Sequence, residues 1–387
     1  MSNPGTANAD LAAMHIPFLR TELPPLDAYL PYLREIEQNN WYSNFGPLVK
    51  RFESQMLSGF FADAGALTTV ANCTLGLTLA LQATVRSGGK YVIMPSFTFA
   101  ATPLATLAAG LEPYFVDVNA DDWSCDTQLI DQALAELGDE VAAVMPYATF
   151  GSAIELDYYT ALQERGMPVV IDAAPGLGAT DPDGSFFAAG FPGCVVFSLH
   201  ATKPFGIGEG GLVYSGSDDK VAAIRRLTNF GFTSPGISAA PGINAKMPEV
   251  AAAVGLAVLE GYTEKLQRLN LLFDSYIGHI DDSSVLSAAE NTQRIRGNAP
   301  HQHMPLILPP SVDVESVQDR MSAAGIGTRR YFHPPCHLQE PLLNYRRGQV
   351  PNTDDIYQRI LCLPLWDGME AAMPGHIIGQ LSALLAG

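Results

Sequence analysis

Short apolar runs alternate with longer alanine- and leucine-rich segments between residues 66 and about 215. The runs span residues 91–95, 141–146, 168–172, 194–198 and 211–215, and the segments between them include 74–85, 99–109 and 127–137. Each run is apolar at nearly every position, as in strands that are buried on both faces, and the longer segments are typical of helices. The pattern predicts an α/β fold with a largely parallel sheet.

The carboxyl ends of three runs carry residues that could form a binding site. Ligands of open parallel sheets bind beyond these ends. They are marked here by Pro95 with Ser96, by Asp172, and by Ser198 with the leucine that follows it. We therefore expect a site at this edge of the sheet.

The C-terminal third has a different character. A long helix is predicted to open at Met247-Pro248 and to continue, with apolar residues at helical spacing, to Leu269. Residues 270–387 mix a helix-like segment at 314–324 with a strand-like one at 304–308. We expect a large domain, residues 1–255, and a smaller α+β domain, residues 256–387.

Composition excludes several classes of protein. With 387 residues, 47% apolar and 16% charged, the chain can bury a large core. Its formal charge of −18 would repel nucleic acid. The five cysteines have no CxxC spacing, which favours reduced thiols. We find no basic leader at the N-terminus and no run of about 18 apolar residues, so we expect a cytoplasmic protein without a membrane anchor.

Lys203 is a candidate covalent residue. It follows a buried strand, precedes a glycine-rich turn, and lies in a region poor in cations. A lysine beside apolar groups loses part of its preference for the ammonium form, and the neutral amine can form a Schiff base with an aldehyde. A solvated or ion-paired lysine would produce the same sequence pattern, so that alternative stays open.

The glycines after Lys203 formally match a dinucleotide-binding fingerprint. In that fingerprint the glycines directly follow a strand and open a helix. Here Gly206, Gly208 and Gly211 begin eight residues after Ser198 and lead into strand-like Leu212-Val-Tyr. We therefore interpret them as a turn and reject a nicotinamide oxidoreductase.

Two further features complete the candidate site. Asp172 ends an apolar run, where a carboxylate is costly unless a cation or a donor meets it; a capping aspartate is the alternative. Thr74 and its neighbours begin a predicted helix, whose N-terminus could bind a phosphate. An ordinary helix cap would look the same.

Together these features meet the needs of pyridoxal phosphate (PLP). A lysine holds its aldehyde, a carboxylate keeps its ring nitrogen protonated, a helix N-terminus and hydroxyls hold its phosphate, and an aromatic side chain covers its ring. Similar order and spacing are found in segments throughout the chain, at residues 41–47, 95–102, 115–118, 172–174, 198–203, 208–211, 229–232, 242–247 and 363–365. On these segments the chain resembles the DegT/StrS group of sugar aminotransferases.

The resemblance implies a fold and a set of cofactor contacts. The fold would be PLP fold type I, the aspartate-aminotransferase-like fold, with a mostly parallel sheet in its large domain. Lys203 would form the Schiff base and Asp172 would pair with the ring nitrogen. The remaining contacts would be to the phosphate and the ring face, from Cys73, Thr74, Leu75, Ser198 and Phe99.

The resemblance also implies a partner and substrates. Asn244 would reach the cofactor phosphate of a neighbouring subunit, which implies a homodimer with shared active sites. The residues at positions where relatives bind a nucleotide-sugar are Lys246, Arg329, Arg330, Tyr331 and His337. The donor of the amino group would be L-glutamate. The histidines at 301, 303, 333 and 337 lack two further well-spaced ligands, so we do not expect a metal.

Three positions depart from the family pattern. Relatives usually carry Gln or His three residues after the pyridinium aspartate, where this chain has Pro175, and a usual His and Tyr are replaced by Ala148 and Phe150. The segments Asn229-Phe-Gly-Phe and Asn244-Ala-Lys-Met resemble the branch that aminates 4-keto-6-deoxy sugars on dTDP.

Three functions are therefore under consideration. The first is a PLP-dependent aminotransferase acting on a nucleotide-activated deoxysugar. The second is a dehydratase of the same fold, although such relatives tend to carry histidine at the position of Lys203. The third is a non-catalytic binding or regulatory protein, suggested by Pro175; the presence of Lys203 and Asp172 weighs against it.

Overall fold

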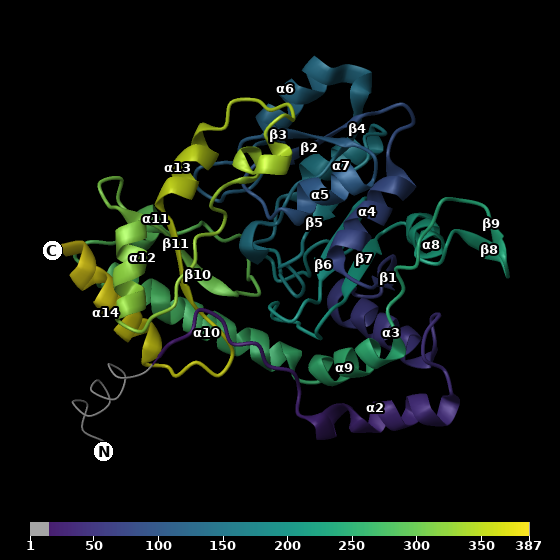
Figure 1. Ribbon diagram of the computed structural model, residues 1–387, viewed down its shortest axis with the longest axis horizontal. Coiled ribbons are helices and arrows are strands. Elements are labelled where there is room, and N and C mark those ends of the chain that lie inside the picture. Colours follow the sequence, from purple (N-terminus) through teal and green to yellow (C-terminus); the bar gives the residue numbers. More distant parts are fainter. Residues whose placement is uncertain (1–14, 387) are drawn as a thin grey trace.

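The computed structural model describes residues 15–386, so most of the N-terminal segment considered above for a leader lies outside the described residues. Figure 1 shows a broad sheet domain and a smaller domain that contains the C-terminus. The helices are α2 (Leu26–Asn39), α3 (Pro47–Phe61), α4 (Cys73–Thr84), α5 (Ala101–Ala108), α6 (Thr127–Leu137), α7 (Leu156–Glu164), α8 (Asp218–Leu227), α9 (Glu249–Leu259), α10 (Tyr262–Asp281), α11 (Ala288–Asn291), α12 (Val314–Ala323), α13 (Pro351–Arg359) and α14 (Met373–Ala386). The strands are β1 (Ala66–Val70), β2 (Tyr91–Pro95), β3 (Glu112–Val116), β4 (Val141–Val144), β5 (Val170–Asp172), β6 (Cys194–Ser198), β7 (Gly211–Ser215), β8 (Phe232–Ser234), β9 (Ile237–Ser238), β10 (His303–Ile307) and β11 (Ile360–Pro364), and the short 3₁₀ turns are η1 (Gly138–Glu140), η2 (Thr149–Gly151), η3 (Cys336–Leu338) and η4 (Glu340–Leu342).

The large domain is built on one mixed sheet. Its strands form two ladders, β3-β2-β4 and β1-β7-β6-β5. Bridges between Val144 and Val169 and between Tyr147 and Asp172 join β4 to β5. Strand β7 runs antiparallel to β1 and β6, and the other neighbours are parallel. The expectation of a largely parallel sheet is confirmed.

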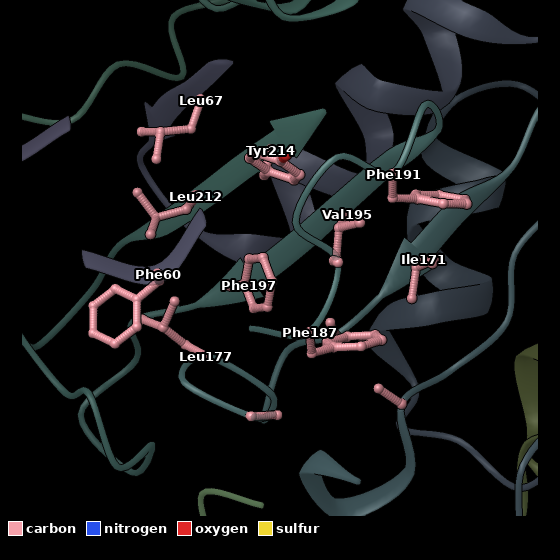
Figure 2. Close-up of a cluster of buried hydrophobic side chains, with 14 of the residues drawn as sticks. Phe60, Leu67, Ile171, Leu177, Phe187, Phe191, Val195, Phe197, Leu212 and Tyr214 are labelled. Atoms are coloured by element: carbon pink, nitrogen blue, oxygen red, sulfur yellow. The ribbon is translucent and has the colours of Figure 1, made fainter. Parts of the chain in front are cut away.

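Helices cover both faces of this sheet, which explains why the strands show no period-two pattern. Along β6, Val195 and Phe197 pack into one apolar cluster, while Cys194 and Val196 pack into another on the opposite face. The first cluster includes residues of α3, α6, α7 and α9, and the second those of α4 and α8. Figure 2 shows the first cluster. Apolar residues are needed on both faces because neither meets water.

One predicted element is wrong. The long helix expected from Met247 to Leu269 is two helices, because α9 ends at Leu259 and α10 begins at Tyr262. Gly261 lies at the break, where its low helix propensity makes a change of direction inexpensive. The break turns Tyr262 toward the large domain, where its hydroxyl donates a 2.7 Å hydrogen bond to the carbonyl of Leu177.

The smaller domain has its own core. Strands β10 and β11 pair antiparallel, and α10, α12 and α14 pack with them around an apolar cluster. Along α10, Tyr262 belongs to the cluster of the large domain and Leu269 to that of the smaller one. The division at residue 255 stays a prediction.

Candidate active site

A cavity of about 670 Å³ lies where β5 and β6 end. Asp172 is the last residue of β5 and Ser198 the last of β6, and both line the cavity. The other residues predicted from the sequence that also line it are Cys73, Thr74, Leu75, Phe99, Lys203 and Tyr331. The fold therefore brings together side chains that are up to about 260 residues apart in sequence.

Lys203 lies in the loop between β6 and β7. The backbone N–H of Lys203 donates a 2.8 Å hydrogen bond to the carbonyl of His200, which holds the loop in a tight turn. Burial lowers the pKa of the Lys203 amine, while Cys73 and Asp172 partly oppose that shift. No hydrogen bond or ion pair within the described residues engages its Nζ, so this amine is available for chemistry.

Asp172 is almost fully buried, at 1% exposure. Oδ2 accepts a 2.7 Å hydrogen bond from the Thr102 hydroxyl, and Oδ1 accepts a 3.1 Å bond from the backbone N–H of Ala174. Burial raises the pKa of Asp172, and Thr102, Ala174 and Lys203 act against the rise. A buried carboxylate with donors but no cation is poised to receive a positively charged group.

Helix α4 points its N-terminus at the same cavity. Asn72 caps this helix by accepting a 2.9 Å hydrogen bond from the backbone N–H of Leu75. Gly211 allows the close approach, because a Cβ there would lie 2.9 Å from the backbone nitrogen of Cys73. The Ser198 side chain lies at the same end of the cavity, so backbone N–H groups and a hydroxyl can meet an anion there.

Phe99 follows β2 and is 56% exposed. Its ring centroid lies 6.3 Å from that of Phe332, which also lines the cavity. The exposed face leaves Phe99 able to cover a flat ligand.

Five residues that were predicted to bind the cofactor or the substrate do not line this cavity. Asn244 and Lys246 lie elsewhere, where Lys246 Nζ donates hydrogen bonds to the side-chain oxygens of Asn229 at 2.8 Å and Asn244 at 2.7 Å. Burial lowers the pKa of Lys246. Arg329 and Arg330 line a second cavity, of about 510 Å³, which shares Phe99, Tyr331 and Phe332 with the first.

His337 is buried away from both cavities. Its Nδ1 lies 2.6 Å from the Ser96 hydroxyl and its Nε2 lies 3.3 Å from Asp354. These contacts tie the end of β2 to α13. The structure therefore does not place His337 among the lining residues.

Membership of a known protein family accounts for this geometry. The model described as the DegT/DnrJ/EryC1/StrS aminotransferase family matches residues 27–382. The chain belongs to this family.

Individual proteins that are similar to this chain support its assignment to the family. Protein Rv3402c of Mycobacterium tuberculosis H37Rv is 31% identical over 369 residues, 92% of this chain and 86% of the relative. The dTDP-4-amino-4,6-dideoxy-D-glucose transaminase of Escherichia coli is 26% identical over 381 residues, 96% of this chain and 98% of the relative.

Solved structures give the fold directly. A candidate PLP-dependent aminotransferase from Bacillus cereus ATCC 10987 superposes with a TM-score of 0.92 at 42% identity, covering 95% of this chain and 100% of that one. DesI, crystallised in the presence of its TDP-sugar product, gives 0.84 at 31% identity, covering 96% and 93%. The protein is therefore a PLP-dependent aminotransferase of fold type I, and the expected fold and cofactor are confirmed.

The residues of the cavity fit PLP. Lys203 and Asp172 line one cavity and influence each other's pKa, yet within residues 15–386 they form no ion pair at 4.0 Å or less. One ligand in this cavity could therefore contact both side chains. The N-terminus of α4 offers its N–H groups at the end where a phosphate would lie. These observations support the predicted roles of Lys203, Asp172 and the start of α4.

The departures from the family pattern change the polarity of one side of the cavity. Phe150 lines it, with its ring 5.6 Å from that of Phe332 and nearly parallel to it. Pro175 is buried and is not a lining residue. Tyr147, which follows β4 and forms an isolated bridge with Asp172, lines the cavity instead, and burial raises the pKa of its phenol.

Sequence reasoning missed several lining residues. Phe18, Tyr147 and His303 all contribute to the cavity, and Thr102 orients Asp172 from outside it. Thr102 lies inside the segment 95–102 that resembles the family, but nothing in that segment indicates its contact with Asp172. His303 lies in the segment His301-Gln-His303, whose only predicted role to be weighed was metal binding.

The sequence led us to expect neither a metal site nor a membrane anchor. Within residues 15–386, we find no group of three or more His, Cys, Asp and Glu side chains arranged to hold a metal ion. Over the same span, none of the helices has the combination of length and apolarity that crossing a bilayer requires.

Proposed function

We propose that this aminotransferase moves the amino group of L-glutamate to the 4-keto group of dTDP-4-keto-6-deoxyglucose. The observation that carries the proposal is the placement of Lys203 and Asp172 in one cavity whose other end is aromatic. Two relatives, from Escherichia coli and Shigella dysenteriae, are named dTDP-4-amino-4,6-dideoxy-D-glucose transaminases, and they are 26% and 29% identical to this chain. The activity that these relatives are named for supports the choice of sugar and of carbon.

The aromatic end of the cavity suits a deoxysugar. Phe18, Phe150, Tyr331 and Phe332 line it, with ring centroids 5.6 to 5.9 Å apart for the pairs Phe150–Phe332, Phe18–Tyr331 and Tyr331–Phe332. The C–H groups of a sugar ring and the methyl group of a 6-deoxysugar can pack against such faces. A 6-hydroxyl packed against these ring faces would lose its hydrogen bonds to water without gaining one from the rings.

The second cavity provides cations for the nucleotide. The Arg329 guanidinium lies over the ring of Phe18, 5.6 Å from its centroid, and Arg330 donates hydrogen bonds to the carbonyls of Tyr357 and Gln358. Arg330 Nε is buried without a partner in the described structure. Since the two cavities share three lining residues, we assign the sugar to the first and the diphosphate to the second.

Two side chains perform the chemistry. When bound, PLP supplies a carbonyl carbon for Schiff-base formation and a ring that withdraws electrons. Asp172, held by Thr102, keeps a proton on the ring nitrogen. As a free amine, Lys203 Nζ would act as a base that accepts the proton from the α-carbon of the amino donor and gives it up again in the second half of the reaction. Its lowered pKa favours the neutral amine that this step needs.

The proposal includes a homodimer. Strands β8 and β9 form an arm that projects from the sheet domain (Figure 1), and it carries exposed Phe232 and Ile237. Phe230 and Ile243 are exposed close by in sequence. An apolar arm of this kind is typical of a subunit interface. Asn244 and Lys246, next to it, would complete the site of the partner subunit.

The test follows the two halves of the reaction separately. PLP-loaded protein should absorb near the wavelength of a bound Schiff base, and L-glutamate should abolish that band with release of one equivalent of 2-oxoglutarate. The resulting amine form should then recover the band when dTDP-4-keto-6-deoxyglucose is added. UDP- and GDP-linked keto sugars serve as competitors for specificity.

One variant and the behaviour of the wild type separate the proposal from its alternatives. Lys203→Ala should lose both half-reactions by at least about a hundredfold, because proton transfer by a positioned base contributes that much or more. Wild type that binds PLP but reacts with no amino donor would overturn the proposal in favour of a binding protein. Wild type that converts the donor but ignores every nucleotide-sugar would overturn only the choice of acceptor.

A further inference from the structure

A buried ring nitrogen in the cavity wall, Nε2 of His303, has no hydrogen-bond partner among the described residues. His303, the first residue of β10, is 6% exposed, and its Nε2 is buried without a hydrogen-bond partner among residues 15–386. A buried polar group left unpaired costs about 1–3 kcal/mol, and each such group in a folded protein calls for an explanation. Since His303 lines the cavity, a ligand there can supply the missing partner.

The ring of His303 is held in place by aromatic neighbours. Phe150 packs against it nearly perpendicularly, with centroids 4.6 Å apart. Tyr331 lies 5.5 Å and Phe18 6.0 Å from it. The backbone is fixed as well, because His303 pairs with Pro364 of β11. The imidazole is therefore a preorganised hydrogen-bonding group at the aromatic end of the cavity.

The charge of this imidazole limits what it can bind. Burial, Lys203 and His301 lower the pKa of His303 to about 3, so the ring is neutral at physiological pH. A neutral imidazole has one donor and one acceptor, which matches a hydroxyl group. It offers no net charge to the carboxylates of an amino-acid donor. The group therefore suits a sugar better than glutamate.

We propose that His303 selects the acceptor by hydrogen bonding a hydroxyl of its sugar ring through Nε2. This inference rests on the proposed function, because it assumes a nucleotide-sugar acceptor. Phe150 and Phe18 border the imidazole, so a sugar seated against them would have a hydroxyl close to the unpartnered Nε2. A site built to bond a hydroxyl discriminates strongly against ligands that lack it.

The chain offers a matched control. His301 is also buried, at 5% exposure, and its ring stacks on that of Phe273 with centroids 3.6 Å apart. It does not line the main cavity. A phenylalanine at 301 therefore removes a nearby buried imidazole without touching the sugar end of the cavity.

The experiment measures binding of unreactive nucleotides by calorimetry on PLP-loaded protein. We compare dTDP with dTDP-glucose, which has no amino or keto group to react. His303→Phe should weaken dTDP-glucose binding about tenfold and leave dTDP binding unchanged, since one hydrogen bond is worth about that factor. His303→Gln, which keeps an amide group near the position of Nε2, should recover part of the loss. His301→Phe should bind both nucleotides like wild type.

The half-reactions give a second readout. His303→Phe should slow the L-glutamate half-reaction much less than the nucleotide-sugar half-reaction, because the donor does not use this nitrogen. If His303→Phe and His303→Gln bind dTDP-glucose as tightly as wild type, or if they weaken dTDP, dTDP-glucose and glutamate equally, the inference is wrong while the proposed function stands. If wild type binds neither nucleotide, the nucleotide-sugar acceptor itself is wrong and the inference falls with it.

Discussion

Thr102 donates a 2.7 Å hydrogen bond to Oδ2 of Asp172 across 70 residues of sequence. Thr102 belongs to α5 and Asp172 ends β5, so the bond joins a covering helix to the sheet at the centre of the site. The Thr102 hydroxyl also lies 2.7 Å from that of Thr98. Asp172 is thus oriented by a short chain of hydroxyls and by no cation of the protein.

Thr102→Val should weaken PLP retention by about tenfold or more. The substitution keeps the shape of the side chain and removes a hydrogen bond to a charged group, worth about 1.5–3 kcal/mol. It also removes one of the groups that lower the pKa of Asp172, so the carboxyl should hold its own proton more readily. The dissociation constant of PLP, measured by equilibrium dialysis, checks this.

The matched variant is Thr106→Val on the same helix. Thr106 is buried and its hydroxyl donates only to the backbone carbonyl of Thr102. PLP affinity should stay within about twofold of wild type. Equal losses in both variants would show that α5 stability, and not the contact with Asp172, governs cofactor binding.

Gly211→Ala should disturb the phosphate end of the cavity. The new Cβ would lie 2.9 Å from the backbone nitrogen of Cys73 and 2.9 Å from a methyl group of Val70. Overpacking of this kind costs about 1–3 kcal/mol. We expect a lower unfolding free energy in urea together with weaker PLP binding, because β7 and the start of α4 must separate.

Gly59→Ala is the control for that substitution. Gly59 lies within α3, and no atom lies within 4 Å of a Cβ placed there. Alanine should stabilise the helix by about 0.5–1 kcal/mol. A Gly211→Ala protein as stable as wild type would contradict the close approach of β7 to α4.

Glu249→Gln should destabilise the fold without touching the site. Helix α3 has no side-chain cap of its own. Glu249, 1% exposed, accepts hydrogen bonds from the backbone N–H groups of Leu48 at 2.8 Å and Val49 at 3.0 Å. Gln supplies only one acceptor oxygen and no charge at the helix N-terminus, so we expect a loss of about 1–3 kcal/mol in unfolding free energy.

Exposed Glu260 provides the comparison, since it accepts a hydrogen bond from the Tyr32 hydroxyl at the surface. Glu260→Gln should change the unfolding free energy by less than about 0.5 kcal/mol. Similar changes in unfolding free energy for both variants would mean that the buried cap contributes no more to stability than the surface contact.

The stability of the PLP-free protein should depend on pH through Lys203. Its folded pKa is lowered from the ordinary value of 10.5, mainly by burial. Between the folded and unfolded pKa values the unfolded chain binds more protons, so unfolding free energy rises with pH across that window and levels off above 10.5. Lys203→Met cannot titrate and lacks this rise.

The measurement is urea unfolding of both PLP-free proteins between pH 7 and 10. The difference, wild type minus Lys203→Met, should increase with pH by up to about 1.4 kcal/mol per unit. A flat difference for Lys203→Met would place the amine in water and remove the physical basis for its neutral form.

Much of the fold was predictable because its signals are local. The runs at β2, β6 and β7 match the observed strands at both ends, since their residues must be apolar to enter the sheet. Strands β1 and β3 were not predicted, and the break at Gly261 was missed. A helix that turns to bury Tyr262 against Phe60 and Phe205 does so for partners far away in sequence.

The site shows the same division. Lys203 and Asp172 were candidates because their residue types contrast with the apolar runs beside them. The contact of Thr102 with Asp172, the unpartnered nitrogen of His303 and the cap that Glu249 places on α3 leave no mark of that kind. Each depends on contact between two segments that are far apart in the sequence, and no local sequence pattern indicates such a contact.

The amino-acid sequence alone determined the alternation of strands and helices, the residues able to carry Schiff-base chemistry and the family to which the chain belongs. Tertiary structure decided which polar groups orient the carboxylate, which side chains form the sugar end of the cavity, and which predicted residues lie elsewhere. The physical reason is range: apolar burial and turn chemistry act over a few neighbouring residues, whereas hydrogen bonds between distant segments exist only after the chain has packed.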